Sequence, residues 1–177
     1  MVKKDIEIVL DADVIIHFAK GEMLSILPSI FPDYKYVVLD IVKNEVLPPV
    51  LGQLENQMIF MKNIQEVKFG HTHEERKEYA RLTSQLGLGR GESASMVYCR
   101  FHDNVLGSSN LRDIIDYCDE YGIKYLTTID FLFFAIKRGI ITKEEADEFI
   151  EKVRNKNSRL PNVDFSTYKC DKLSIFS

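Results

Sequence analysis

The chain has 177 residues, of which 45% are hydrophobic and 28% are charged, as expected for an ordinary globular protein. Its formal net charge of −4 excludes a protein that binds nucleic acid through an overall basic surface, so such binding would need a local basic patch or metal ions. The apolar runs are too short to span a bilayer, no signal-peptide pattern is present, and the three cysteines lack zinc or disulfide spacing. We therefore expect a cytoplasmic protein with no membrane partner.

Short apolar runs alternate with helical patterns in the first half of the chain. The run 6–10 (IEIVL) is rich in β-branched residues and predicts a buried strand, which ends at two aspartates and leads into a helix that stops at Gly21. Residues 22–31 look helical, with a break or kink at Pro28. The other elements expected in this half are strands at 35–40 and 64–69 and helices at 41–47 and 50–61.

The second half of the chain continues this alternation. Thr72 and Glu75 have the spacing of a capping box, which predicts a helix over 73–87, and an apolar stripe after Gly91 predicts the next helix. The remaining expected elements are strands at 104–109 and 123–128 and helices at 110–122, 129–139 and 143–156. Strands that alternate with helices predict a three-layer α/β/α fold around a central parallel sheet.

No linker, repeat or low-complexity segment divides the chain. We therefore expect a single domain over residues 1–177, with its core at about 6–140 and a C-terminal helical extension and tail at 141–177. The tail from about residue 157 has little periodicity. This extension has three alternative roles, because it could cover a cleft, mediate dimerisation or complete the core.

Acidic and amide side chains recur where the predicted strands end. In chain order they are Asp11 and Asp13, Glu45, Glu92 behind a glycine loop, and Asn110 with Asp113. Each has a simple alternative role as a helix cap, a helix-dipole partner or a solvated surface residue. Because the carboxyl ends of parallel strands form one edge of the sheet, we expect these groups to converge there. Crowded carboxylates are stable only with a neutralising cation, and oxygen ligands select Mg²⁺ or Mn²⁺.

The glycine loop 86–91 (LGLGRG) delivers a carboxylate to this edge instead of receiving a phosphate. It does not match the dinucleotide-binding pattern GxGxxG, and it follows a helix instead of the first strand. Its glycines allow a tight turn that brings Glu92 close to the strand ends. Divalent cations held by such carboxylates activate water and neutralise charge during phosphodiester hydrolysis.

With these residues in place, the chain resembles the PIN domain family, which includes the VapC-type toxin ribonucleases, over about residues 6–140. VLDADVII is similar to the opening motif of the family and places the first acid on Asp11, with Asp13 at the polar second position. VVLDIVKNEV is similar to the segment with the second acid, at Glu45, and GLGRGESAS to the third motif, with its acid at Glu92.

The fourth motif departs from the pattern of the family. The segment 108-SSNLRD-113 supplies the amide of Asn110 at the first position and Asp113 at the second. The segment 122–142 (GIKYLTTIDFLFFAIKRGIIT), which contains the last predicted strand, resembles a subgroup with an extended C-terminus, but Thr127 and Asp130 replace the two glycines of its motif. Asp130 is therefore a candidate for a further oxygen ligand.

The resemblance implies a Mg²⁺- or Mn²⁺-dependent endoribonuclease that acts on RNA. It also implies that the protein is the toxin of a toxin–antitoxin pair, that its partner is a small DNA-binding antitoxin, and that it forms a homodimer. It implies the catalytic residues Asp11, Glu45, Glu92 and Asp113, the metal ligands Asp11, Glu45, Glu92, Asn110 and Asp113, and the additional candidates Asp13 and Asp130. The alternatives are a catalytically weakened PIN-like module that binds RNA or protein, and a metal-dependent phosphatase that acts on small substrates.

Basic side chains near the acids are candidates for contact with RNA phosphates, namely Lys43, Arg90 and Arg112. Ordinary exposed basic residues are the alternative for each of them. The sequence shows no platform of interleaved basic and aromatic residues that would stack single-stranded bases.

Overall fold

The structure is a computed structural model that describes residues 5–172, so the ends of the expected domain, 1–4 and 173–177, lie outside the described residues. Its centre is a parallel sheet with the strand order β3-β2-β1-β4-β5. The strands are β1 (Glu7–Leu10), β2 (Lys35–Leu39), β3 (Ile64–Val67), β4 (Val105–Gly107) and β5 (Tyr125–Leu126). All five lie within the ranges expected from the sequence, and the predicted parallel sheet is confirmed.

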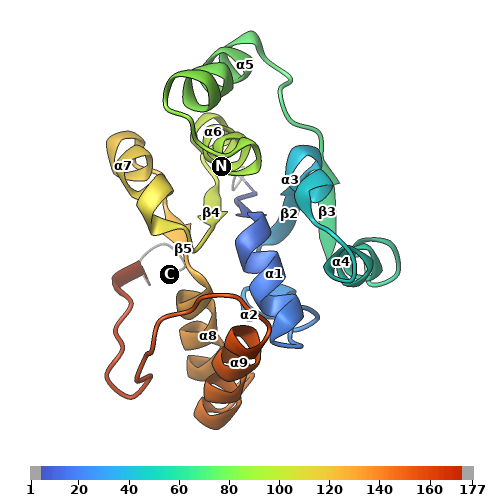
Figure 1. Ribbon diagram of the computed structural model, residues 1–177, viewed down its shortest axis with the longest axis vertical. Coiled ribbons are helices and arrows are strands. Elements are labelled where there is room, and N and C mark those ends of the chain that lie inside the picture. The colour runs from blue at the N-terminus through green and yellow to red at the C-terminus, as the bar shows by residue number, and fades with distance from the viewer. Residues whose placement is uncertain (1–4, 173–177) are drawn as a thin grey trace.

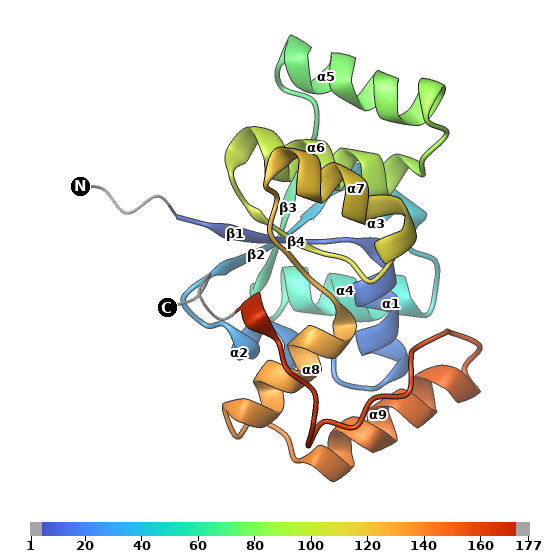
Figure 2. The same ribbon diagram turned by 90° about the vertical axis from the view of Figure 1, so that its left-hand side faces the viewer.

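Helices cover both faces of the sheet, as Figures 1 and 2 show. One face carries α5 (His73–Ala80), α6 (Arg90–His102) and α7 (Leu111–Tyr121), with the short α3 (Asp40–Glu45) packed beside α6. The other face carries α1 (Ala12–Lys20), α2 (Leu27–Ile30), α4 (Val50–Ile59), α8 (Thr128–Lys137) and α9 (Lys143–Asn155). This arrangement confirms the predicted three-layer α/β/α fold. None of these helices is long and apolar enough to cross a membrane within the described residues.

Two predicted helices differ from the observed ones. The segment 22–26 forms turns, and the helix α2 starts only at Leu27 with Pro28 in its first turn. Proline is tolerated there because the first turn does not need its N–H, so the expected break at Pro28 is wrong. The helix predicted over 73–87 ends as α5 at Ala80 and continues as η1 (Arg81–Gln85), a π-helical turn that leads to Gly87 at φ +67°.

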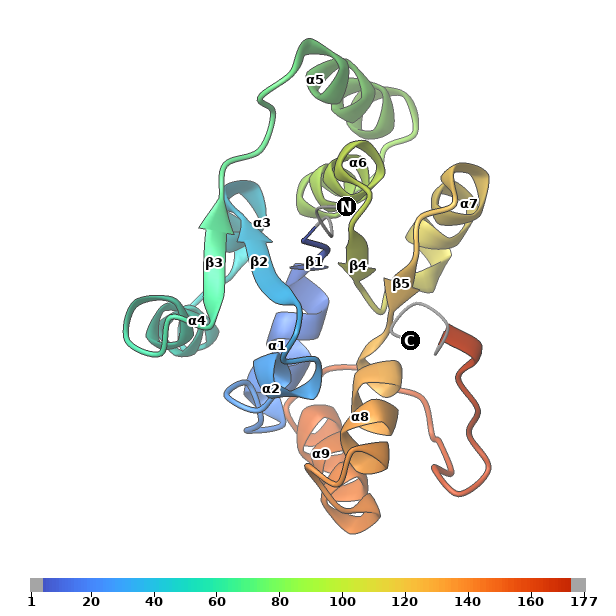
Figure 3. The same cartoon turned by 180° about the vertical axis from the view of Figure 1, so that it is seen from behind.

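The C-terminal extension completes the core, which is one of its three expected roles. Leu160, Phe165 and Cys170 are buried although the segment that carries them is irregular. Figure 3 shows that this segment, drawn in red, returns from α9 past α8 and ends beside β5. Its last contacts are made by Tyr168 Oη and Lys172 Nζ, which donate to the Asp130 carboxylate at 2.6 and 2.8 Å.

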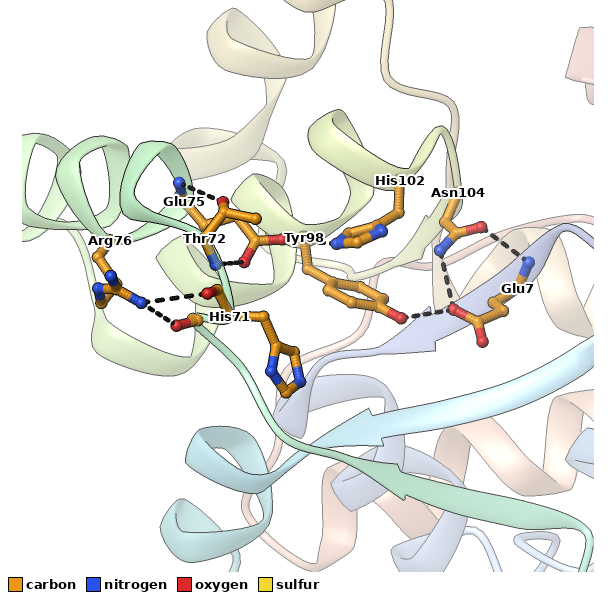
Figure 4. Close-up of polar contacts among 9 residues, drawn as sticks. Glu7, His71, Thr72, Glu75, Arg76, Tyr98, His102 and Asn104 are labelled. Atoms are coloured by element: carbon orange, nitrogen blue, oxygen red, sulfur yellow. Dashed lines mark hydrogen bonds and ion pairs between the residues drawn. The ribbon is translucent and has the colours of Figure 1, made fainter.

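A polar network occupies the amino edge of the sheet, away from the strand ends that carry the candidate site (Figure 4). Thr72 and Glu75 form the predicted capping box of α5, and the buried Glu75 Oε1 lies 2.5 Å from His102 Nε2. The His102 ring packs against Tyr98, whose hydroxyl donates to Glu7 Oε2 at the start of β1. These bonds join α5, α6 and β1, so His102 has a structural role.

Candidate active site

The strand order places a topological switch between β1 and β4, where open α/β sheets form their sites. Leu10 lies opposite Gly107 in register, and the Asp11 N–H donates to the Gly107 carbonyl at 2.8 Å. Asp11 is only 5% exposed, and its Oδ1 accepts the Ala12 N–H at 2.9 Å. Asp11 therefore caps α1, as the simple alternative had it, and also lies beside the end of β4.

The turn after β4 is held by the two aspartates that follow β1. Ser108 Oγ donates to Asp11 Oδ2 at 3.3 Å, and the Asn110 N–H donates to Ser108 Oγ at 3.4 Å. The Ser109 N–H donates to Asp13 Oδ2 at 2.8 Å. Residues almost a hundred positions apart are thus brought into one hydrogen-bonded group at the switch point.

Asn110 joins the third and fourth acids of the predicted site. Its Nδ2 donates to Glu92 Oε2 at 2.7 Å and to Asp113 Oδ2 at 2.8 Å. Its side chain makes no capping bond to the helix α7 that it precedes. The side chain of Asn110 therefore does not act as a helix cap, which was its simple alternative role.

Glu92 has one carboxylate oxygen that the protein leaves unbonded. Glu92 is 9% exposed, and its buried Oε1 has no hydrogen-bond partner among residues 5–172. Burial, and the charges of Asp113, Asp13 and Glu45, raise the pKa of Glu92 to about 7, against the hydrogen bond from Asn110 that lowers it. A buried oxygen without a partner costs about 1–3 kcal/mol, so a positively charged group fits there.

The remaining acids lie in the same electrostatic field. Burial raises the pKa of Asp11 well above its usual range, and the neighbouring charges of Asp13 and Glu92 raise it further. Burial also raises the pKa of Asp13, although hydrogen bonds from the Ser109 and Val14 N–H groups oppose the increase. The negative charges at this edge thus destabilise one another in the absence of a cation.

Glu45 reaches the cluster from the end of α3 because residue 91 is a glycine. The Gly91 N–H donates to Glu45 Oε1 at 2.9 Å. A Cβ at position 91 would lie 2.3 Å from Glu45 Oε2, which is shorter than any real contact. The third glycine of the loop therefore leaves room for a second carboxylate, a role that goes beyond the expected tight turn.

We expect Gly91→Ala to weaken the binding of Mn²⁺ at this edge by about 10- to 100-fold without loss of stability. The new methyl group displaces the flexible Glu45 side chain, whereas alanine inside α6 favours the helix by about 0.5–1 kcal/mol. Gly52→Ala in α4 is the matched control, because a Cβ there meets no atom within 4 Å. Titration with Mn²⁺ and urea unfolding of both variants check this, and a Gly91→Ala protein that binds Mn²⁺ as tightly as the unaltered protein would contradict it.

The donor set of this edge fits a hard divalent cation. It consists of carboxylate, amide and hydroxyl oxygens, which are ligands that Mg²⁺ and Mn²⁺ prefer. No three His, Cys, Asp or Glu side chains within residues 5–172 are gathered as a ready-made metal site. The NH₂ group of Asn110 lies between the Glu92 and Asp113 carboxylates and donates to both of them. Rotation of the amide by half a turn would place Oδ1 there, so that all three side chains could face one cation.

Other predicted residues lie outside this group. The Asp130 carboxylate accepts the Thr127 N–H and the bonds from Tyr168 and Lys172, so its contacts do not support the expected role as an additional ligand. Lys43 forms an ion pair with Glu66, with 3.1 Å between Nζ and Oε2. The two other basic candidates, Arg90 and Arg112, are exposed beside the site.

A hydrogen-bonded chain behind the site was missed at the sequence level. Ser109 Oγ donates to Thr128 Oγ1 at 2.8 Å, and His17 Nδ1 lies 2.8 Å from the same atom. Burial lowers the pKa of His17 to about 4, so its ring is neutral near pH 7. The signal in the sequence was the position of His17 four residues after Asp13, which places both on one face of α1.

Comparison with known proteins adds one match to this geometry. A family model described as a PIN domain matches residues 7–167. This range contains all the acids of the cluster and most of the C-terminal extension. A comparison with curated proteins found no match.

Proposed function

The chain belongs to the PIN domain family, and we propose that it is a Mg²⁺- or Mn²⁺-dependent endoribonuclease that hydrolyses RNA phosphodiester bonds. PIN domains are generally nucleases, which supports a hydrolase at a coarse level. The observation that carries the finer proposal is the unbonded, buried Oε1 of Glu92 within a group of like charges. A divalent cation bound there supplies charge neutralisation at the phosphate and acidifies a water molecule.

The side chains of the cluster have separate roles in this proposal. Asp11, Glu92 and Asp113 would hold the cation, with the amide oxygen of Asn110 turned towards it. Glu45 would complete the shell or hold a second ion. Ser108 is a positioning residue, because its hydroxyl donates to Asp11 Oδ2 and so fixes the direction of that carboxylate.

Two exposed arginines support RNA as the substrate. Arg90 begins α6 two residues before Glu92, and Arg112 lies next to Asp113. In the proposed complex, each guanidinium contacts a phosphate that flanks the scissile bond, which places the RNA strand without reading its sequence.

The experiment that tests this proposal is a cleavage assay on single-stranded RNA with the purified protein. We expect cleavage within the strand in Mn²⁺ or Mg²⁺ and none after addition of EDTA, because chelation removes the group that neutralises the phosphate. Restored cleavage on addition of excess Mn²⁺ excludes irreversible damage by EDTA. Cleavage that persists in EDTA would contradict the proposal, as would a protein inert on RNA but active on a chromogenic phosphomonoester.

A second candidate function is an RNA- or protein-binding module that has lost catalysis. It is favoured by the two bonds from Asn110 Nδ2, which satisfy one oxygen each of Glu92 and Asp113 without a metal. An amide fixed in this orientation would keep the cation out. Such a protein would bind RNA equally well with or without Mn²⁺.

Within the first proposal, the chain is the toxin of a toxin–antitoxin pair and forms a homodimer. What supports partners of this kind is the run of exposed apolar side chains at the C-terminal end of α4. Ile59, Phe60 and Met61 are 58–77% exposed there. Exposed apolar side chains that follow one another in this way are typical of protein contacts.

A further inference from the structure

A hollow lies beside the acidic cluster, between the C-terminal segment and β5. It has a volume of about 300 Å³, at the lower end of the range for small-molecule sites. Its wall on the side of the cluster is formed by Ser109 and Leu111, the two neighbours of Asn110 in the chain. A chain-like ligand bound at the acidic cluster would therefore enter the hollow if it continued along this wall.

The hollow is also lined by basic and aromatic side chains from distant parts of the chain. They are Arg159, Tyr168 and Lys172 of the C-terminal segment and Tyr125 of β5. The Lys172 ammonium lies 3.9 Å from the centre of the Tyr125 ring, and it also pairs with Asp130 at 2.8 Å. The tertiary structure thus assembles a platform of interleaved basic and aromatic groups that the sequence did not reveal.

Charge distinguishes this hollow from the cluster beside it. Lys172 neutralises Asp130, and Arg159 is exposed, so the lining carries an excess of positive charge. A neighbouring hollow of about 340 Å³ shares Tyr125, Tyr168 and Lys172 with it and adds Lys124, Lys169 and Asp171. Each lining therefore has a small excess of positive charge. The first hollow also presents the apolar side chains of Leu160, Pro161 and Val163, which suits a nucleotide with an anionic phosphate and an apolar base face.

We propose that the hollow between Tyr125, Arg159 and Tyr168 binds one nucleotide of a single-stranded RNA next to the scissile phosphate. The inference deepens the proposed function, because it assigns RNA to a subsite of the same active site. The tyrosine rings contact the base, since every base has a face that stacks on an aromatic ring. The Arg159 guanidinium contacts a phosphate, and the volume limits the subsite to about one nucleotide.

The test compares four variants by the fluorescence anisotropy of a labelled hexauridylate in EDTA at low salt. Arg159→Ala should reduce the slope of log affinity against log salt by about 0.7, as expected when a single strand loses one phosphate contact. Tyr125→Leu should weaken binding at least about fivefold through the loss of stacking. Lys137→Ala, which removes a charge at the exposed end of α8, and Tyr125→Phe, which keeps the ring, should bind like the unaltered protein.

Cleavage of the same oligonucleotide in Mn²⁺ gives an independent readout. Arg159→Ala and Tyr125→Leu should raise KM with kcat unchanged, because the subsite binds substrate and transition state alike. Binding losses without any cleavage by the unaltered protein would support the subsite and refute the nuclease. No binding by the unaltered protein, or equal binding by all four variants, would overturn the subsite whether or not RNA is cleaved. Because Arg159 is exposed, Arg159→Ala should fold and still tests the subsite if Tyr125→Leu fails to fold.

Discussion

Asp11→Asn is expected to lower kcat for RNA cleavage by at least about 1,000-fold, since the carboxylate that holds the cation supplies several kcal/mol to the transition state. The same change should leave the metal-free protein at least as stable as before near pH 7. Burial and the charges of Asp13 and Glu92 already raise the pKa of Asp11, so its ionised form costs free energy in the folded state. An asparagine keeps the size of the side chain and the acceptor for the Ala12 N–H.

A large loss of activity without a loss of stability separates this role from a purely structural one. Asparagine caps a helix about as well as aspartate, so an aspartate that only capped α1 would change neither the stability nor the rate on this substitution. Asp147→Asn on the exposed face of α9 is the matched control, and it should change neither quantity. Single-turnover cleavage and urea unfolding in EDTA measure both. Full activity in the Asp11→Asn protein would exclude this aspartate from catalysis.

Glu92→Gln is expected to make the metal-free protein more stable above pH 7 and to flatten its dependence on pH. The pKa of Glu92 is about 7 in the folded protein, against a usual 4.5. The folded state therefore holds a proton that the unfolded state has lost between these values, and stability falls as pH rises from about 4.5 to 7. The difference corresponds to up to about 3 kcal/mol, and glutamine, which does not titrate, removes it.

The measurement for Glu92→Gln is the free energy of unfolding in EDTA at pH 5, 6 and 7.5. The contribution of His17 to stability depends on pH in the opposite direction. Its pKa is about 4 in the folded protein against a usual 6.5, so stability is lost as pH falls below about 6.5. This contribution is the same in both proteins and cancels in their difference. Addition of Mg²⁺ at pH 7.5 should stabilise the unaltered protein but not the variant. Equal slopes for the two proteins in EDTA would contradict the assignment.

The sequence predicted the sheet and its acidic edge because both depend on local patterns. Runs such as 6–10 and 35–40 are apolar and β-branched, and Asp11 follows the first of them directly. In a parallel sheet, strand ends meet at one edge whatever the details of packing. The position of Asp11, Glu92 and Asn110 at this edge could therefore be predicted before their contacts were known.

Contacts that depend on tertiary packing could not be predicted in this way. Gly91 and Glu45 are 46 positions apart, and nothing local indicates that the glycine makes room for the carboxylate. Asp130 looked like one more acid after a strand, but its partners Tyr168 and Lys172 come from an irregular segment without periodicity. The role of such a segment is set by a few buried side chains, which leave no repeating pattern in the sequence.

The most direct measurement is calorimetric titration of Mn²⁺ into the metal-free protein and into its Asp11→Asn variant. We expect the unaltered protein to bind Mn²⁺ in the millimolar range or tighter and to release protons near pH 7, because Glu92 must lose its proton to become a ligand. Heats measured in two buffers of different ionisation enthalpy report those protons. The variant should bind much more weakly. Absence of Mn²⁺ binding by the unaltered protein, or equal binding by both proteins, would contradict a shared cation at Asp11, Glu92, Asn110 and Asp113.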